Sequence, residues 1–146
     1  MNEEEICVYK LDDNNTFPMI YEILKDVIYK ATEEKVKNTL MEYNESRNKI
    51  LFGYFVNKEI IGIIGVEENN KNDIIEISHF GINEKYRNKK YGTKLMDYVQ
   101  KKYSGKTLYL TTDDDAIGFY RKYGYKTTEF YKENNGEKYK RYKCEL

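Results

Sequence analysis

Apolar residues in the N-terminal third of the chain recur with two different spacings. A short apolar run predicts a strand, and apolar positions three or four residues apart predict helices. The predicted elements are a strand over Ile6–Leu11, a helix from about Thr16 to Ala31 and a helix from Glu33 to about Met41. The polar loop 12–16 ends at Thr16, the expected N-cap of the first helix, and Pro18 fits a first turn whose N–H groups are unbonded. Thr32 is the expected N-cap of the second helix.

The middle of the chain reads as three consecutive strands. Two apolar runs, Ile50–Val56 and Ile60–Glu67, flank the dipeptide Asn57-Lys58, which is a spacing typical of a β-hairpin. A third run, Ile74–Ile82, follows a polar turn at positions 69–72. We expect these strands to be antiparallel, because short turns join antiparallel strands.

The C-terminal half alternates helices and strands. The first helix is marked by Leu95, Met96, Val99 and Tyr103 and ends at Ser104-Gly105, and a strand over Thr107–Thr111 follows it. The second helix follows Asp113-Asp114-Asp115, ends at Gly124, and has an apolar face of Ala116, Phe119, Tyr120 and Tyr123. A hairpin of Tyr125–Tyr131 and Tyr139–Cys144 completes the chain. The element order is β-α-α-β-β-β-α-β-α-β-β. Without an internal repeat or linker, residues 1–146 are expected to form a single α+β domain with a mixed, mostly antiparallel sheet.

Charged side chains are distributed unevenly along the chain. Its 146 residues include 25 basic and 25 acidic residues, so the formal net charge is zero. Residues 1–83 carry 9 basic and 16 acidic side chains, a net charge of −7, whereas residues 84–106 carry 8 and 2, a net charge of +6. One short basic segment in a neutral chain favours a local anion site over a surface that coats nucleic acid.

The cysteines argue against a disulfide-linked or metal-binding protein, and the apolar runs argue against a secreted or membrane-spanning one. Cys7 and Cys144 lie near opposite ends of the chain and belong to no Cys/His cluster, which favours two reduced thiols and no metal site. The acidic start of the chain does not resemble a signal peptide, and the longest apolar run, Ile60–Val66, is much shorter than the ~20 residues of a membrane span. We therefore expect a cytoplasmic protein with no membrane partner.

The basic segment lies in a predicted strand–loop–helix unit. Four basic residues occupy the loop after Ile82, and a helix starts near Gly92; the loop residues are Lys85, Arg87, Lys89 and Lys90. A helix N-terminus presents free N–H groups and the positive end of its dipole, so this unit predicts a pyrophosphate site. Neither GxxxxGK[ST] nor GxGxxG occurs in the chain, which argues against an NTPase or dinucleotide loop. Basic loops of this kind are common, however, and by spacing alone a solvated helix start over Lys85–Lys94 is the favoured interpretation.

Two segments resemble motifs of the GNAT superfamily of acyl-CoA N-acyltransferases. The first is motif A, (Q/R)-x-x-G-x-(G/A), which corresponds to Arg87-Asn88-Lys89-Lys90-Tyr91-Gly92, with Lys90 in place of the first glycine. The second, A-x-x-F-Y-x-x-x-G-F, resembles the segment from Ala116 to Tyr125, and Asp113 replaces the usual preceding asparagine. Two motifs at the right separation are more specific than either alone.

The resemblance implies where acetyl-CoA binds. The sheet is expected to splay between the strand that ends at Ile82 and the strand Thr107–Thr111, with the pantetheine arm in the gap. The positions that the family assigns to the cofactor are Phe80, Ile82, Arg87, Asn88, Lys89, Lys90, Tyr91, Gly92, Thr93 and Asp113. Backbone N–H groups from Arg87 to Thr93 would bind the pyrophosphate, and those near Phe80 to Ile82 would stabilise the thioester oxygen.

The resemblance also implies the catalytic groups. Tyr120 aligns with the tyrosine that protonates the leaving thiolate, a step that costs little if the environment of Tyr120 lowers its pKa from ~10. Spacing alone would place this side chain in the apolar stripe of its helix. Glu76 takes the position of a family base on the strand Ile74–Ile82. Regular alternation puts Glu76, Ser78, Phe80 and Ile82 on one face of the strand. The only histidine, His79, is the second choice, because it shares that face only if a bulge shifts the register.

The expected function is transfer of an acetyl group from acetyl-CoA to a primary amine, on a small molecule or a lysine side chain. The acidic N-terminal half suggests a cationic acceptor. A catalytically silent acyl-CoA sensor is the alternative, because Lys90 and Asp113 depart from the family pattern. A third candidate function is nucleic-acid binding through residues 85–106, whose basic side chains are interleaved with tyrosines. The C-terminal strands are a candidate interface for a homodimer.

Overall fold

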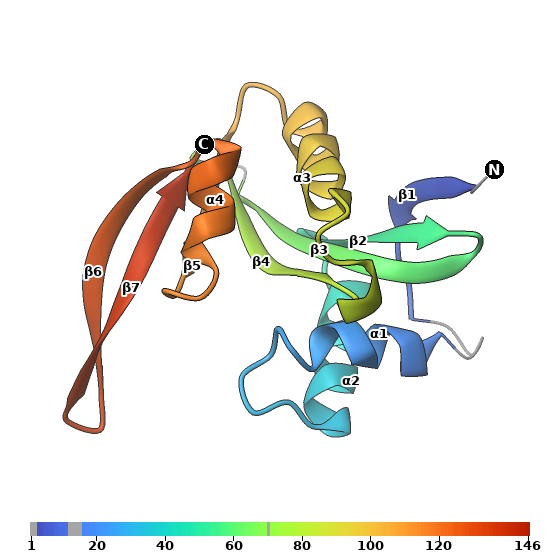
Figure 1. Cartoon of the computed structure of the whole chain (residues 1–146), viewed down its shortest axis with the longest axis horizontal. Coiled ribbons are helices and arrows are strands. Elements are labelled where there is room, and N and C mark those ends of the chain that lie inside the picture. The colour runs from blue at the N-terminus through green and yellow to red at the C-terminus, as the bar shows by residue number, and fades with distance from the viewer. Residues whose placement is uncertain (1–2, 12–15, 70) are drawn as a thin grey trace.

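A computed structural model describes residues 3–11, 16–69 and 71–146 of the chain (Figure 1). The strands are β1 (Glu4–Val8), β2 (Lys49–Val56), β3 (Glu59–Asn69), β4 (Ile74–Ile82), β5 (Thr107–Thr112), β6 (Lys126–Asn134) and β7 (Glu137–Glu145). The helices are α1 (Phe17–Leu24), α2 (Glu33–Glu45), the short 3-10 helix η1 (Glu84–Tyr86), α3 (Tyr91–Lys102) and α4 (Ile117–Tyr123). This order confirms the α+β element order expected from the sequence. Most of the predicted loop 12–16 and one residue of the turn 69–72 lie outside the described residues.

One seven-stranded sheet runs through the molecule in the order β1-β2-β3-β4-β5-β7-β6. Only β4 and β5 are parallel, so the sheet is mixed and mostly antiparallel, as predicted. Helices α1 and α2 pack on one face, where Ile20, Leu24, Val36 and Leu40 join residues of β2 and β3 in a buried cluster. Helices α3 and α4 pack on the other face with residues of β2 to β5 and β7. We call these the α1/α2 face and the α3/α4 face (Figure 1).

The two central strands separate after three residue pairs. Ile74, Ile75 and Glu76 of β4 pair with Thr107, Leu108 and Tyr109 of β5, and no further pair follows among the described residues. Beyond Glu76, β4 continues toward α1, whereas the β5–β7–β6 part turns away from it (Figure 1). We call this divergence the β4/β5 splay; it confirms the splayed sheet expected from the family resemblance.

A β-bulge in β4 reverses the expected alternation of its side chains. Val66 of β3 pairs with Ile77, but the preceding Gly65 pairs with His79, so Ser78 has no partner on β3. Ile77 and Phe80 consequently both pack on the α3/α4 face, and His79 lies on the α1/α2 face with Glu76. The uninterrupted alternation predicted for this strand is therefore wrong. The extra residue lets the apolar side chains on both sides of the bulge reach the same core.

The first two helices differ in length from the prediction. Helix α1 ends at Leu24 instead of Ala31, although Val27 and Ile28 still pack against its buried cluster from a series of turns. The spacing of apolar residues predicts which side chains are buried, but it does not distinguish a helix from a series of turns. Thr16 makes no capping hydrogen bond, and its hydroxyl instead lies 2.9 Å from that of Tyr9. Helix α2 extends four residues beyond Met41 to Glu45, and the Thr32 side chain caps it as predicted, accepting from the N–H of Lys35 at 3.1 Å.

No helix in the described part of the chain is long and apolar enough to span a membrane. Cys7 in the edge strand β1 and Cys144 in β7, five strands away in the sheet, are free cysteines, which agrees with two reduced thiols. The described residues also contain no group of three or more His, Cys, Asp and Glu side chains that could hold a metal ion.

Candidate active site

The loop after β4 delivers an uncapped helix N-terminus to the β4/β5 splay. Helix α3 begins at Tyr91, no side chain caps it, and its first turn contains no acidic residue. The backbone N–H groups of the first turn are thus left for an anionic ligand, whose charge the helix dipole also favours. A Cβ added to Gly92 would lie 3.4 Å from the Phe80 ring and 3.8 Å from Ile82, so this turn adjoins the end of β4. The arrangement fits the pyrophosphate of acetyl-CoA.

Two residues of this loop have left-handed backbones. The φ angles of Asn88 and Lys90 are +62° and +69°. Glycine adopts this conformation freely, whereas a residue with a Cβ pays roughly 1–2 kcal/mol. Lys90 occupies the position where the family motif has its first glycine, and it adopts a backbone conformation that glycine would reach without strain. The departure at Lys90 therefore adds an ammonium group at the cost of backbone strain.

Arg87 is already engaged in the structure. Its Nε donates to the carbonyl oxygen of Ile82 at 3.0 Å, and its guanidinium lies 3.0 Å from a carboxylate oxygen of Asp26. Asp26 follows α1, so this pair joins the cofactor loop to the helices of the opposite face. Lys89 lies over the ring of Tyr86 at 5.9 Å. Sequence reasoning missed Asp26, because its partner is 61 positions away and no motif links them.

Phe80 and Phe119 contact one another across the splay. Their ring centroids are 5.3 Å apart, with Phe80 on β4 and Phe119 on α4. Ile82, the next residue of β4 on this face, is also partly buried against the α3/α4 core. The structure thus brings Phe80, Ile82 and Gly92 together, as the family resemblance implied for residues of one site.

Tyr120 lies behind this aromatic contact. The residue is 7% exposed, and its ring centroid is 6.3 Å from that of Phe80 and 5.4 Å from that of Tyr125. Its hydroxyl makes no hydrogen bond with any described residue. Burial raises the pKa of Tyr120, and the neighbouring Cys144 and Asp113 add to the shift. Proton donation by Tyr120 was expected to cost little only if its environment lowered this pKa, and that condition is not met; the hydroxyl keeps its proton and is a hydrogen-bond donor.

Asp113 shapes the start of α4. Its Oδ1 accepts from the N–H groups of Asp115 and Ala116, both at 3.1 Å. The sequence predicts that the acidic run 113–115 supplies the N-cap and first-turn carboxylates of this helix, and that is wrong: the N-cap of α4 is Ala116, no side chain caps it, and its first turn contains no acidic residue. Asp113 instead orders the turn before the helix, which begins at Ile117. A carboxylate can accept in this way as well as the asparagine of the family motif does.

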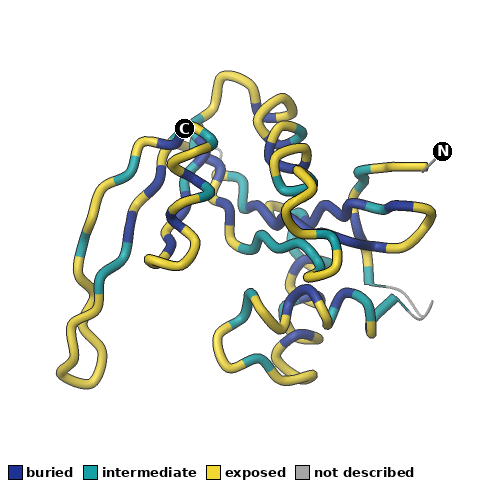
Figure 2. The backbone as a smooth tube through the Cα atoms, viewed as in Figure 1, coloured by how far each residue is buried: buried dark blue, intermediate teal, exposed yellow. Residues whose placement is uncertain are grey.

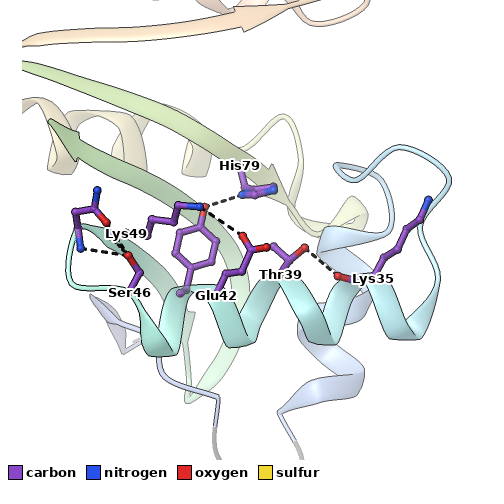
Figure 3. Close-up of polar contacts among 8 residues, drawn as sticks. Lys35, Thr39, Glu42, Ser46, Lys49 and His79 are labelled. Atoms are coloured by element: carbon purple, nitrogen blue, oxygen red, sulfur yellow. Dashed lines mark hydrogen bonds and ion pairs between the residues drawn. The ribbon is translucent and has the colours of Figure 1, made fainter.

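His79 is held by a tyrosine of α2. The Tyr43 hydroxyl lies 2.6 Å from Nδ1 of His79, and the two rings meet edge to face with centroids 5.6 Å apart. Figure 3 shows His79 reaching from β4 toward α2, next to the Glu42–Lys49 ion pair of 3.5 Å. Burial lowers the pKa of His79, Lys49 lowers it further, and Glu42 acts in the opposite direction. The imidazole is therefore neutral at neutral pH.

Both candidate bases lie on the α1/α2 face. Glu76 is exposed and stands at the last β4–β5 pair, opposite Tyr109. His79 lies on this face beyond that pair, where β4 and β5 have diverged. Sequence reasoning did not identify Tyr43 as the partner of His79. The spacing of Val36, Leu40 and Tyr43 does place this tyrosine on the buried side of α2.

Comparison with known proteins agrees with this geometry. A family model described as acetyltransferase (GNAT) domain matches residues 15–146. Among solved structures, the chain is similar to the ribosomal-protein-S18-alanine N-acetyltransferase of Escherichia coli, with 14% identity over 97% of this chain and 93% of the other and a TM-score of 0.69. It is also similar to a spermidine N-acetyltransferase of Vibrio cholerae, with 12% identity over 98% of this chain and 92% of the other and a TM-score of 0.76. A third similar structure is the PaiA N-acetyltransferase of Thermoplasma acidophilum in complex with coenzyme A, with 18% identity over 97% of this chain and 99% of the other and a TM-score of 0.63.

The splayed sheet, the uncapped helix and the matched domain define an acetyltransferase. The chain belongs to the GNAT family.

Proposed function

We propose that the protein transfers the acetyl group of acetyl-CoA to a primary amine by direct attack on the thioester. The observation that carries this proposal is the position of the uncapped α3 N-terminus beside Phe80 and Ile82 at the β4/β5 splay. A ligand that binds its pyrophosphate there can extend an arm between the two strands, whose facing backbone groups are unpaired beyond Glu76 and Tyr109. The family match and the coenzyme A bound to the PaiA relative support the choice of donor.

The cofactor-binding groups follow from this placement. Backbone N–H groups of Arg87, Asn88, Lys89, Lys90, Tyr91, Gly92 and Thr93 would hold the pyrophosphate, and Phe80 and Ile82 would line the arm. Lys90 adds a positive charge at the same point. Asp113 orders the turn before α4 and thereby fixes Tyr120 and Phe119 on the far side of the arm.

The chemistry requires two proton transfers. An amine with a pKa near ~10 is protonated at neutral pH, so a base must remove a proton before the nitrogen attacks the thioester carbonyl. We assign this step to Glu76, directly or through water, with His79 as the second candidate. Main-chain N–H groups near Phe80 to Ile82 stabilise the oxygen as its negative charge develops. Tyr120, which is protonated, donates to the leaving thiolate.

An amine-panel screen with mass-spectrometric detection tests the function directly. Acetylated products from at least one primary amine, together with free coenzyme A in equal amount, are the expected result. The competing function is a silent acyl-CoA sensor. Calorimetric binding of coenzyme A without product from any amine, peptide or lysine-containing protein would establish the sensor and exclude the transferase.

A further inference from the structure

The β6–β7 hairpin separates its charges onto two faces. Tyr142 and Cys144 are buried in the α3/α4 core, so alternate residues of β7 lie on that face and the residues between them on the α1/α2 face. With the register of β6, this places on the α3/α4 side Glu129, Glu133, Lys138 and Lys140, and on the α1/α2 side Lys126, Lys132, Glu137, Arg141, Lys143 and Glu145. The first set has two cations and two carboxylates. The second has four cations and two carboxylates.

Ion pairing follows the same division. On the α3/α4 side, Lys140 lies 3.6 Å from Glu129, and Glu133 is directly opposite Lys138. On the α1/α2 side, Glu145 is opposite Lys126 in the register, which leaves Lys132, Arg141 and Lys143 without a facing acid on the hairpin. None of these three forms an ion pair within the described ranges 3–11, 16–69 and 71–146. The hairpin therefore presents uncompensated positive charge on one face only.

That face is open to solvent and belongs to the catalytic side of the sheet. The cluster beneath α1 and α2 contains residues of β2 and β3 and none of β5, β6 or β7. The outer hairpin is exposed along most of its length (Figure 2). The α1/α2 face also carries Glu76 and His79, the two candidate bases. A molecule approaching these bases thus meets the cationic face of the hairpin.

Arg141 brings this charge to the edge of the splay. Its guanidinium donates to the Thr111 hydroxyl of β5 at 3.3 Å. Beyond the Glu76–Tyr109 pair, this face carries His79 on β4 and Thr111 on β5. Arg141 therefore stands across the splay from His79, separated from it by more than the ~5 Å spacing of paired strands. Lys143 is directly opposite Thr111 but its ammonium turns to the ring of Phe130, at 5.4 Å.

We propose that the acceptor is an amine that also carries an anionic group, a carboxylate or a phosphate, and that Arg141 binds this group with help from Lys143. The inference rests on the proposed transferase function and adds the class of its acceptor. Charge complementarity identifies the occupant: an anion at Arg141 neutralises the cationic face while the amine of the same molecule reaches the base across the splay. The acidic residues that suggested a cationic acceptor are divided: Glu4 and Glu5 lie on β1 at the far edge of the sheet, whereas Glu42 lies near His79 and Glu67 is opposite Glu76, where they favour the amine end of the same molecule.

Matched acceptor pairs test the inference. L-lysine against cadaverine differs by a carboxylate, and glucosamine 6-phosphate against glucosamine differs by a phosphate. Binding to the coenzyme A complex is measured by calorimetry, and kcat/KM is measured with acetyl-CoA. In at least one pair we expect the anionic member to bind about 10-fold more tightly, and the pair that shows the preference distinguishes carboxylate from phosphate. Arg141→Gln should abolish the preference, Arg141→Lys should retain part of it, and Lys143→Gln should reduce it less than Arg141→Gln.

Lys138→Gln is the matched control, because it removes one cation from the opposite face of the same hairpin. It should leave both pairs unchanged. Equal binding within both pairs, or equal effects of Arg141→Gln and Lys138→Gln, would overturn the inference. If acceptors bind with the expected preference but are never acetylated, the transferase function is contradicted and the anion site at Arg141 is not. Acetylation of the amines that lack the anionic group, with no effect of Arg141→Gln, would support the transferase function and contradict an anionic group on the acceptor.

Discussion

The hydroxyl of Tyr43 lies 2.6 Å from Nδ1 of His79, directly over Gly65 of β3. The three residues come from α2, β4 and β3, and they meet at the bulge that turns His79 to the α1/α2 face. A histidine fixed at Nδ1 has its other ring nitrogen, Nε2, available to a substrate or water. This contact makes the position of His79 depend on the residue at position 65.

Gly65→Ala is expected to destabilise the protein by about 1–3 kcal/mol. The added Cβ would overlap the Tyr43 hydroxyl and force this side chain away from His79. Urea unfolding provides the measurement. Gly118→Ala is the control, because a Cβ there meets nothing within 4 Å in helix α4. That variant should be more stable than the wild type by about 0.5–1 kcal/mol, and equal effects of the two substitutions would contradict the contact.

The only histidine of the chain should make stability depend on pH. Burial lowers the pKa of His79 in the folded protein below its unfolded value of ~6.5. Between the two values the unfolded chain binds more protons, so the free energy of unfolding falls as the pH is lowered through ~6.5 and levels off below the folded pKa. His79→Gln should flatten this part of the profile. An NMR titration of the single imidazole that gives a pKa above 6.5 would contradict the prediction.

Tyr120→Phe should lower turnover by ~10²-fold or more and leave acetyl-CoA affinity nearly unchanged. The fold should tolerate this change, because the Tyr120 hydroxyl forms no hydrogen bond with a described residue. Since burial raises its pKa, the wild type should lose no activity through Tyr120 ionisation below pH ~10.

Tyr123→Phe is a control on the same helix. Its hydroxyl donates to Oδ1 of Asp97 at 2.6 Å and also lies 2.9 Å from the Gln100 side chain, so the variant should lose about 1 kcal/mol of stability while keeping wild-type turnover. Steady-state kinetics and calorimetry compare the two variants. Wild-type kcat in Tyr120→Phe would remove its role as the acid.

The base on β4 can be assigned from pH–rate profiles. Removal of the base should change the acidic limb of kcat/KM, because that limb reports protonation of the group in the free enzyme. We expect this change, with a loss of ~10²-fold, in Glu76→Gln, and a smaller effect in His79→Gln. If only His79→Gln alters the limb, the base is His79.

Substitutions of Lys90 separate backbone strain from charge. Both Lys90→Gly and Lys90→Ala remove the ammonium, but only glycine relieves the strain at a φ of +69°. Lys90→Gly should therefore be about 1 kcal/mol more stable than Lys90→Ala in urea unfolding. Both should bind coenzyme A more weakly, by about 3-fold at low salt and less at high salt. Unchanged affinity would show that the ammonium does not contact the cofactor.

Short-range signals predicted most of the fold. The hairpin around Asn57-Lys58, the bounds of β4 and the start of β5 follow from runs of apolar residues that end at polar turns. The bulge at Ser78 could not be located in this way. Its position depends on which residues of β3 and α2 meet β4, and this pairing is not encoded in the spacing along β4 itself.

The site was predictable to the extent that its motifs are continuous in the sequence. The left-handed Lys90 and the turn at Asp113 correspond to motif positions and were found. Asp26, Tyr43 and Arg141 were not, because each acts through a residue that is distant in the chain. The faces of the hairpin also required the register of β6 and β7, which net charge by segment cannot supply.

The three residue pairs between β4 and β5 are the only strand pairing that joins the two halves of the sheet in the described structure. A ligand in the splay would contact both halves in the folded protein and has no equivalent site in the unfolded chain. Folding and cofactor binding are then linked by mass action, and the free energy of unfolding rises with the logarithm of free ligand, by about 2.7 kcal/mol at 100 times the Kd. A supply of acetyl-CoA above its Kd would thereby stabilise the folded chain as well as feed its reaction.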